Sequence, residues 1–135
     1  MTLGTRYTFD TRLGGSVAQA RPLVEAALKA EGFGVLTEID VAATMKAKLG
    51  IDRAPYLILG ACNPPLAYRA IEADPSVGAL LPCNVVLREE AGETIVEVLD
   101  PAAAMGIVDD GRIRDVAADA RERLQRVVAV LEAQA

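Results

Sequence analysis

The chain has 135 residues, 52% of them hydrophobic, which predicts one soluble domain with an ample core. Its formal net charge of −5 argues against nucleic acid binding and against a basic membrane-surface helix, both of which need a basic surface. No apolar run is long enough to cross a bilayer, and the charged N-terminal residues do not resemble a signal peptide, so we expect a cytoplasmic protein.

Two elements are predicted at the start of the chain. Residues 7–13 alternate between apolar or aromatic and polar side chains, which is the pattern of a half-buried strand. Ser16 and Gln19 then fit a capping box, so a helix begins there. Pro22 falls inside this helix, or within its first turn if the helix begins later. Gly32 supplies the left-handed residue that ends the helix.

The middle of the chain predicts two more strands, each followed by a helix. Residues 33–41 form the first of these strands, and Asp40 can cap a short helix that ends at Gly50. Residues 55–62 are almost wholly apolar, which is typical of a central strand that is covered on both faces. Asn63 caps the following helix, whose first turn accommodates two prolines.

The last part of the chain predicts a hairpin and a long helix. Residues 80–89 and 93–99 form two strands that a tight turn joins. Residues 100–111 contain proline and glycine breakers, so we expect irregular structure there. Residues 112–133 place their apolar side chains on one helical face, and their arginines are interleaved with acids as on a solvated surface.

The order of these elements predicts the fold class. A hairpin makes the sheet at least partly antiparallel, and helices follow most of the other strands. We therefore expect a single α+β domain, a two-layer sandwich with a mostly antiparallel sheet and helices on one face. The strand over residues 55–62 lacks the polar side chains of a solvated face, so we predict that a partner covers the other face, in a homodimer.

Several blocks of sequence, taken together and in order, resemble one protein family. The blocks are residues 34–41 (GVLTEIDV), Met45-Lys46, residues 48–50 (KLG), residues 55–64 (PYLILGACNP), residues 78–86 (GALLPCNVV), Asp100-Pro101 and Met105. They are similar to the family called domain of unknown function 302. The resemblance implies a fold like that of the TATA-binding-protein class, β-α-β(4)-α, often as a dimer, and it implies no established activity. Such a fold does not imply DNA binding.

Two Cys-Asn pairs, Cys62-Asn63 and Cys83-Asn84, are the main candidates for a site. If their strands are antiparallel, both cysteines lie at the same end of the sheet. The start of a helix at Asn63 would lower the pKa of a nearby thiol. Such thiols could bind a soft metal ion such as Cu(I), exchange with a disulfide, or carry a persulfide. Alternatively, both are small buried side chains, and the asparagines cap helices or form turns.

The types of residue present limit the chemistry further. The chain contains no histidine, which excludes Ser-His-Asp and Cys-His catalysis and imidazole metal ligands. Met45 and Met105 could add thioether ligands to a metal at the cysteines. The spacing of the two cysteines matches no recognised metal signature, and no phosphate or dinucleotide motif is present, so the sequence leaves any cofactor unknown.

Three other polar residues are candidates for a ligand site. Glu38 and Asp40 share one face of a predicted strand, and paired carboxylates perform acid–base chemistry where burial separates their pKa values. Alternatively, Asp40 caps the short helix and Glu38 pairs with a lysine on a solvated face. The hydroxyl of Tyr56 could donate to a ligand, although a tyrosine at a strand start is usually part of the core rim.

Three functions follow from these observations. We favour a small-ligand or soft-metal binding protein with its site at Cys62, Asn63, Cys83 and Asn84. A thiol or persulfide redox enzyme would use the same cysteines, so whether the chain is an enzyme stays open. The third is a non-catalytic dimeric accessory protein, in which these residues are structural and the dimer surface matters.

Overall fold

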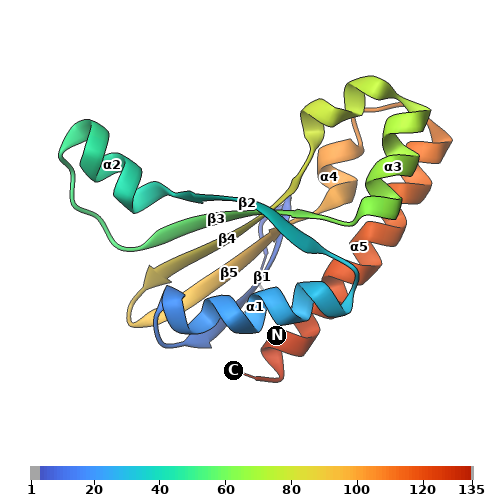
Figure 1. The fold of residues 1–135 in the computed structure, drawn as a ribbon. Helices are drawn as coiled ribbons and strands as arrows, with labels where there is room; N and C mark the ends of the chain where they lie inside the picture. Colours follow the sequence, from blue (N-terminus) through green and yellow to red (C-terminus); the bar gives the residue numbers. More distant parts are fainter. Residues whose placement is uncertain (1–3, 135) are drawn as a thin grey trace.

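The computed structural model describes residues 4–134 as a five-stranded sheet with helices on one face (Figure 1). The strands are β1 (Thr8–Gly14), β2 (Gly34–Asp40), β3 (Tyr56–Cys62), β4 (Cys83–Glu90) and β5 (Glu93–Leu99). Their order in the sheet is β1-β5-β4-β3-β2, and all four neighbouring pairs are antiparallel. The predicted α+β sandwich with a mostly antiparallel sheet is therefore confirmed.

Most of the helices pack on one face of this sheet. The helical elements are α1 (Val17–Ala30), α2 (Val41–Leu49), α3 (Pro64–Ala73), the 3-10 helix η1 (Pro75–Leu80), α4 (Pro101–Met105) and α5 (Gly111–Glu132). Helices α1, α3 and α4 all contact α5, and α2 alone lies away from this group (Figure 1). No helix within residues 4–134 is both long and apolar enough to span a membrane.

The core lies between the sheet and the apolar stripe of α5. Leu59, Val85, Leu87 and Val96 point from the sheet toward the helices and are fully buried. They meet side chains such as Leu124 and Leu131 of α5, in one continuous cluster. Because alternate strand residues point to opposite faces, the residues between them lie on the face without helices, which we call the open face.

Local capping signals set the helix boundaries as predicted. The capping box at α1 is present: the Gln19 N–H donates to Ser16 Oγ, and the Ser16 N–H donates to Gln19 Oε1. Pro22 lies inside α1 rather than in its first turn. Asp40 caps α2 and Asn63 caps α3, each by accepting a backbone N–H three residues later.

Two segments differ from the predictions. Residues 101–105 form the short helix α4 instead of irregular structure, because Pro101 suits the first turn and Asp100 caps it by accepting the Ala102 N–H. The predicted strand over residues 80–89 begins only at Cys83, because residues 75–80 form η1. Leu80 is apolar because it packs against the core, not because it lies in a strand.

The segment from β2 through α2 to β3 extends away from the rest of the molecule (Figure 1). We call residues 36–55 of this segment the arm. Helix α2 has no buried residue, and most of β2 is exposed. A bulge between Val35 and Thr37 interrupts the pairing of β2 with β3. The arm is thus connected to the sheet by strand pairing and is hardly supported by packing.

Candidate functional site

Cys62 and Cys83 lie at the same end of the sheet, as predicted. Strands β3 and β4 are antiparallel, and Ala61 lies directly opposite Cys83. Directly opposite residues point to the same face, so Cys83 shares the helix-facing side with Ala61. Cys62, the next residue along, is on the side of the open face. The two thiols are neighbours in the sheet but lie on opposite faces, Cys62 half-buried and Cys83 buried, and both are free.

The pKa values of these thiols differ from our expectation. Burial raises the pKa of Cys83 to about 11, and the nearby charge of Cys62 adds to this effect. Burial also raises the pKa of Cys62. The expected lowering by the helix start at Asn63 is therefore wrong, because desolvation of the thiolate dominates. Both thiols are mostly protonated at neutral pH, which disfavours a thiolate nucleophile.

The two asparagines have different roles. Asn63 is buried, and its Oδ1 accepts the Leu66 N–H at 3.3 Å. Its Nδ2 donates to the carbonyl oxygen of Glu31, also at 3.3 Å, which ties the start of α3 to the end of α1. Asn84 is exposed on the open face, opposite Gly60. Asn63 is thus committed to the fold, and Asn84 is accessible to a ligand.

The structure does not bring the predicted soft-metal ligands together. Met45 lies on α2 and Met105 is buried on α4, at opposite ends of the molecule (Figure 1). Within residues 4–134, no group of three or more cysteine, aspartate or glutamate side chains is arranged to hold a metal ion. A metal at Cys62 and Cys83 would therefore depend on those two sulfurs.

Glu38 and Asp40 share the helix-facing side of β2, where they lie opposite Leu59 and Leu57. We expected Glu38 to pair with a lysine. It forms an ion pair with Arg21 of α1 instead, because α1 packs under β2. Asp40 has the predicted role of a cap, with its Oδ1 2.9 Å from the N atom of Ala43.

A groove of about 430 Å³ lies between the start of α1 and the base of the arm. It is lined by Ser16, Val17, Ala18, Arg21, Asp40, Pro55, Tyr56, Leu57 and Glu89. Two of the predicted site residues, Asp40 and Tyr56, therefore contribute to one cavity. Arg53 adds a cation–π contact at its edge, with the guanidinium 5.0 Å from the centre of the Tyr56 ring.

Glu89 is the residue of this groove that the sequence analysis missed. It follows Val85 and Leu87 in the alternation of β4, so it lies on the helix-facing side of the sheet. Its side chain is half-buried, and its carboxylate has no hydrogen bond or ion pair within residues 4–134. An acid in the apolar register of a strand was the signal that would have identified it.

A smaller hollow of about 220 Å³ lies on the open face. Its lining is Tyr7, Thr8, Tyr56, Asn84, Val86, Glu97 and Leu99. Tyr56 and Asn84 are both predicted site residues, so Tyr56 borders the hollow as well as the groove. Glu97 is already bound by Arg88, with 2.7 Å between Nε and Oε1.

Comparison with known proteins identifies the family. A model of the family "Domain of unknown function DUF302" matches residues 9–131. The chain belongs to this family. Its fold is also that of a solved structure described as an uncharacterized conserved protein DUF302 from Bacillus stearothermophilus. The two chains are 30% identical, with a TM-score of 0.86, over 94% of this chain and 99% of the other. No curated protein matches this chain.

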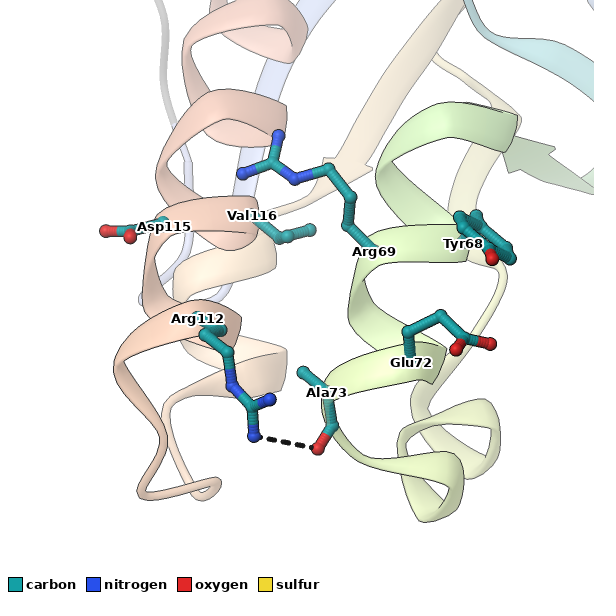
Figure 2. A pocket seen from close by; sticks show the side chains of 7 residues that line it. All are labelled: Tyr68, Arg69, Glu72, Ala73, Arg112, Asp115 and Val116. Carbon is teal, nitrogen blue, oxygen red and sulfur yellow. Dashed lines mark hydrogen bonds between the residues drawn. The ribbon is translucent and has the colours of Figure 1, made fainter.

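A third hollow of the DUF302 domain, of about 300 Å³, lies between α3 and α5 and contains none of the predicted site residues (Figure 2). Arg112 donates from Nη2 to the carbonyl oxygen of Ala73 at 3.1 Å and also pairs with Asp110. Figure 2 shows Tyr68 and Asp115 pointing to different sides of this helix pair. The polar groups here do not converge, so the groove beside α1 is the better candidate site.

Proposed function

We propose that this DUF302 domain binds a small organic molecule that carries a positively charged group, in the groove between α1 and the arm. The groove's volume of about 430 Å³ falls in the range of small-molecule sites, roughly 300–1,000 Å³. The acids and bases that line the hollow between α3 and α5 are equal in number, whereas the groove is lined by two acids and one base. The excess of negative charge favours a ligand that carries a positive charge.

The observation that carries the proposal is the carboxylate of Glu89, which has no hydrogen bond or ion pair in the part of the chain that the structure describes. Asp40 adds a second negative charge to the groove, and among the described residues Arg21 is the one positive charge in its lining. The carboxylates of Glu25 and Glu38 bind Arg21 and raise its pKa, so its charge is already balanced. A ligand entering the groove therefore meets net negative charge, which favours a cation.

The rest of the lining suits a short apolar chain. Val17 and Ala18 come from the first turn of α1, and Pro55 and Leu57 come from the base of the arm. An alkylamine satisfies both requirements, because its ammonium group pairs with Glu89 while its methylene groups displace water from the apolar wall.

The test is a titration of isotope-labelled protein with butylamine, followed by the backbone amide resonances. We expect shifts at residues 17, 18 and 57, and none with n-butanol, which has the same apolar chain without the charge. Glu89→Gln should weaken the binding at least about tenfold, since a hydrogen bond to a charged group contributes roughly 1.5–3 kcal/mol.

Glu122→Gln is the matched control, because Glu122 is exposed on α5 and does not line the groove. It removes the same charge from the chain and should leave the butylamine affinity unchanged. Equal shifts with n-butanol, or equal affinities of the Glu89→Gln and Glu122→Gln variants, would contradict the proposal.

A second candidate function is soft-metal binding at Cys62 and Cys83. It is supported by one observation, that the charge of Cys62 is near enough to raise the pKa of Cys83. It requires the two thiols, which point to opposite faces of the sheet, to turn toward each other. Because Cu(I) binds thiolates, it would have to displace the proton of a buried thiol. Wild-type protein should then withdraw stoichiometric Cu(I) from a coloured chelator, and Cys62→Ser should withdraw none. Equal uptake by both proteins would reject this site.

A further inference from the structure

The two carboxylates that line the groove beside α1 come from strands that are not neighbours. Asp40 ends β2, and Glu89 lies near the end of β4. Strand β3 runs between them, with Leu57 opposite Asp40. Glu89 lies opposite Pro55, because its N–H donates to the Pro55 carbonyl oxygen at 3.1 Å. Both acids share the helix-facing side of the sheet with Leu57, so they lie on either side of this buried leucine.

The register of the sheet sets the distance between these two acids. Neighbouring strands lie about 4.8 Å apart, and each residue advances about 3.3 Å along a strand. Asp40 and Glu89 are separated by two strand spacings and by two positions along β3, so their Cα atoms are roughly 12 Å apart. Strand side chains stand roughly perpendicular to the sheet, so a single ammonium group does not reach both carboxylates.

Each of these carboxylates has an oxygen atom available to a ligand. Glu89 has no hydrogen bond or ion pair within residues 4–134. Asp40 Oδ1 accepts the Ala43 N–H, and Asp40 Oδ2 has no partner in the same part of the chain. Arg21, the base of the lining, is bound by other carboxylates, and Arg53 at the edge of the groove forms an ion pair with neither acid. Two negative charges therefore remain for a ligand to neutralise.

We propose that the ligand of this groove is a diamine, one ammonium group pairing with Glu89 and the other with Asp40. This inference rests on the proposed function and names the class of ligand. An extended 1,4-diaminobutane places its nitrogen atoms about 6 Å apart, and a charge-assisted hydrogen bond at each end adds about 2.8 Å. It therefore reaches carboxylate oxygen atoms up to about 12 Å apart, which covers the separation that the register sets.

The surface between the two acids suits the methylene chain of such a ligand. Leu57 lies between Asp40 and Glu89 in the sheet, and Val17 and Ala18 of α1 also line the groove. The methylene groups displace water from these apolar side chains while the ends form ion pairs. A monoamine gains the same apolar contacts but leaves one carboxylate without a partner.

The first test compares three probes by titration of isotope-labelled wild-type protein: 1,4-diaminobutane, butylamine and N-acetyl-1,4-diaminobutane. Acetylation keeps the chain and removes one positive charge. The diamine should bind at least about fivefold more tightly than either monocation, the contribution of one well-placed ion pair at an exposed position. This gain exceeds the doubling that two equivalent ends give. The diamine should also shift the amide resonance of Ala43, because that amide donates to Asp40.

The outcomes of this comparison separate the diamine proposal from the proposed function. If butylamine binds and the affinity of the diamine is no more than doubled, the diamine proposal is overturned and the groove remains a site for a single positive charge. If none of the three probes shifts the amide resonances of residues 17, 18 and 57, both proposals are overturned.

The second test shows whether Asp40 supplies the second contact. Asp40→Asn removes the charge and keeps the cap of α2, because asparagine caps helices about as well as aspartate. The preference for diamine over butylamine should then fall to the doubling that equivalent ends give. Asp52→Asn is the matched control, since Asp52 is an exposed acid of the arm that does not line the groove. It should leave the preference at its wild-type value, and equal preferences in the two variants would overturn the proposal.

Discussion

The two ends of β3 differ in how far their side chains are committed to the fold. At the end that leads into α3, Asn63 is bonded through both of its side-chain polar atoms, and Cys83 is buried. At the end that follows the arm, the Glu89 carboxylate and the Lys48 ammonium have no partner within residues 4–134. Groups without an internal partner are free to bind another molecule, so the arm end is where we expect binding.

The committed end also shows why polar residues in a sequence motif need not be functional. Every described buried side-chain nitrogen or oxygen atom has a hydrogen-bond partner. A buried polar atom without one would lose the interactions that water gave it, which costs about 1–3 kcal/mol. The side-chain amide of Asn63 therefore forms its hydrogen bonds within the protein, and it has few left to offer a ligand.

The largest expected difference in the free energy of unfolding is between truncating a leucine of the sheet and truncating one of the arm. Leu59→Ala removes a fully buried side chain from β3 and should lower the free energy of unfolding by about 2–5 kcal/mol. Leu49→Ala removes a mostly exposed side chain from the arm and should change it by no more than about 0.5 kcal/mol. Urea unfolding measures both.

These unfolding curves are recorded at several protein concentrations, because any contribution from contacts between copies then shows as a dependence of stability on concentration. A loss at Leu49 as large as that at Leu59 would mean that the arm packs within its own chain. It would remove the distinction between the two ends.

Local signals made the fold predictable from the sequence. Ser16 with Gln19, Asp40 and Asn63 each begin a helix where their capping chemistry places it, because a cap depends only on the next three residues. The alternation of residues 7–13 and the apolar run of residues 55–62 predicted strands of the sheet, and the turn between β4 and β5 predicted its antiparallel hairpin.

The candidate site was less predictable because it depends on contacts between distant segments. The sequence does not show that Arg21 of α1 meets Glu38 of β2, since that pair forms only when the helix packs under the sheet. Which face of the sheet Cys62 and Cys83 each point to depends on the register between β3 and β4, and no local sequence pattern determines that register. The sequence shows Glu89 as an acid among the apolar positions of its strand. Only the packing of α1 against the sheet makes its carboxylate part of a groove.

Raising the pH should reveal the burial of Cys83. Its pKa is about 11 in the folded chain against 9.0 in the absence of burial. Between these values the unfolded chain loses the thiol proton and the folded chain keeps it, so stability falls as the pH rises from about 9 to 11. The difference corresponds to a loss of roughly 3 kcal/mol.

The comparison for this experiment is Cys83→Ala, because lysines and tyrosines titrate in the same range in both proteins. The free energy of unfolding of wild type should fall more steeply above pH 9 than that of the variant. If stability falls equally steeply with pH in both proteins, the thiol ionises as easily in the folded chain as in the unfolded one. Cys83 would then be accessible to solvent rather than buried.

The smallest contrast is between the two asparagines of the Cys-Asn pairs. Asn63→Ala removes the cap of α3 and the bond to Glu31, and should cost about 1–2 kcal/mol of stability. Asn84→Ala removes an exposed side chain and should stay within about 0.5 kcal/mol. Thermal unfolding of both variants measures the two losses of stability. Equal losses would mean that Asn84 is also committed to the fold, and the open-face hollow would then lose its accessible polar group.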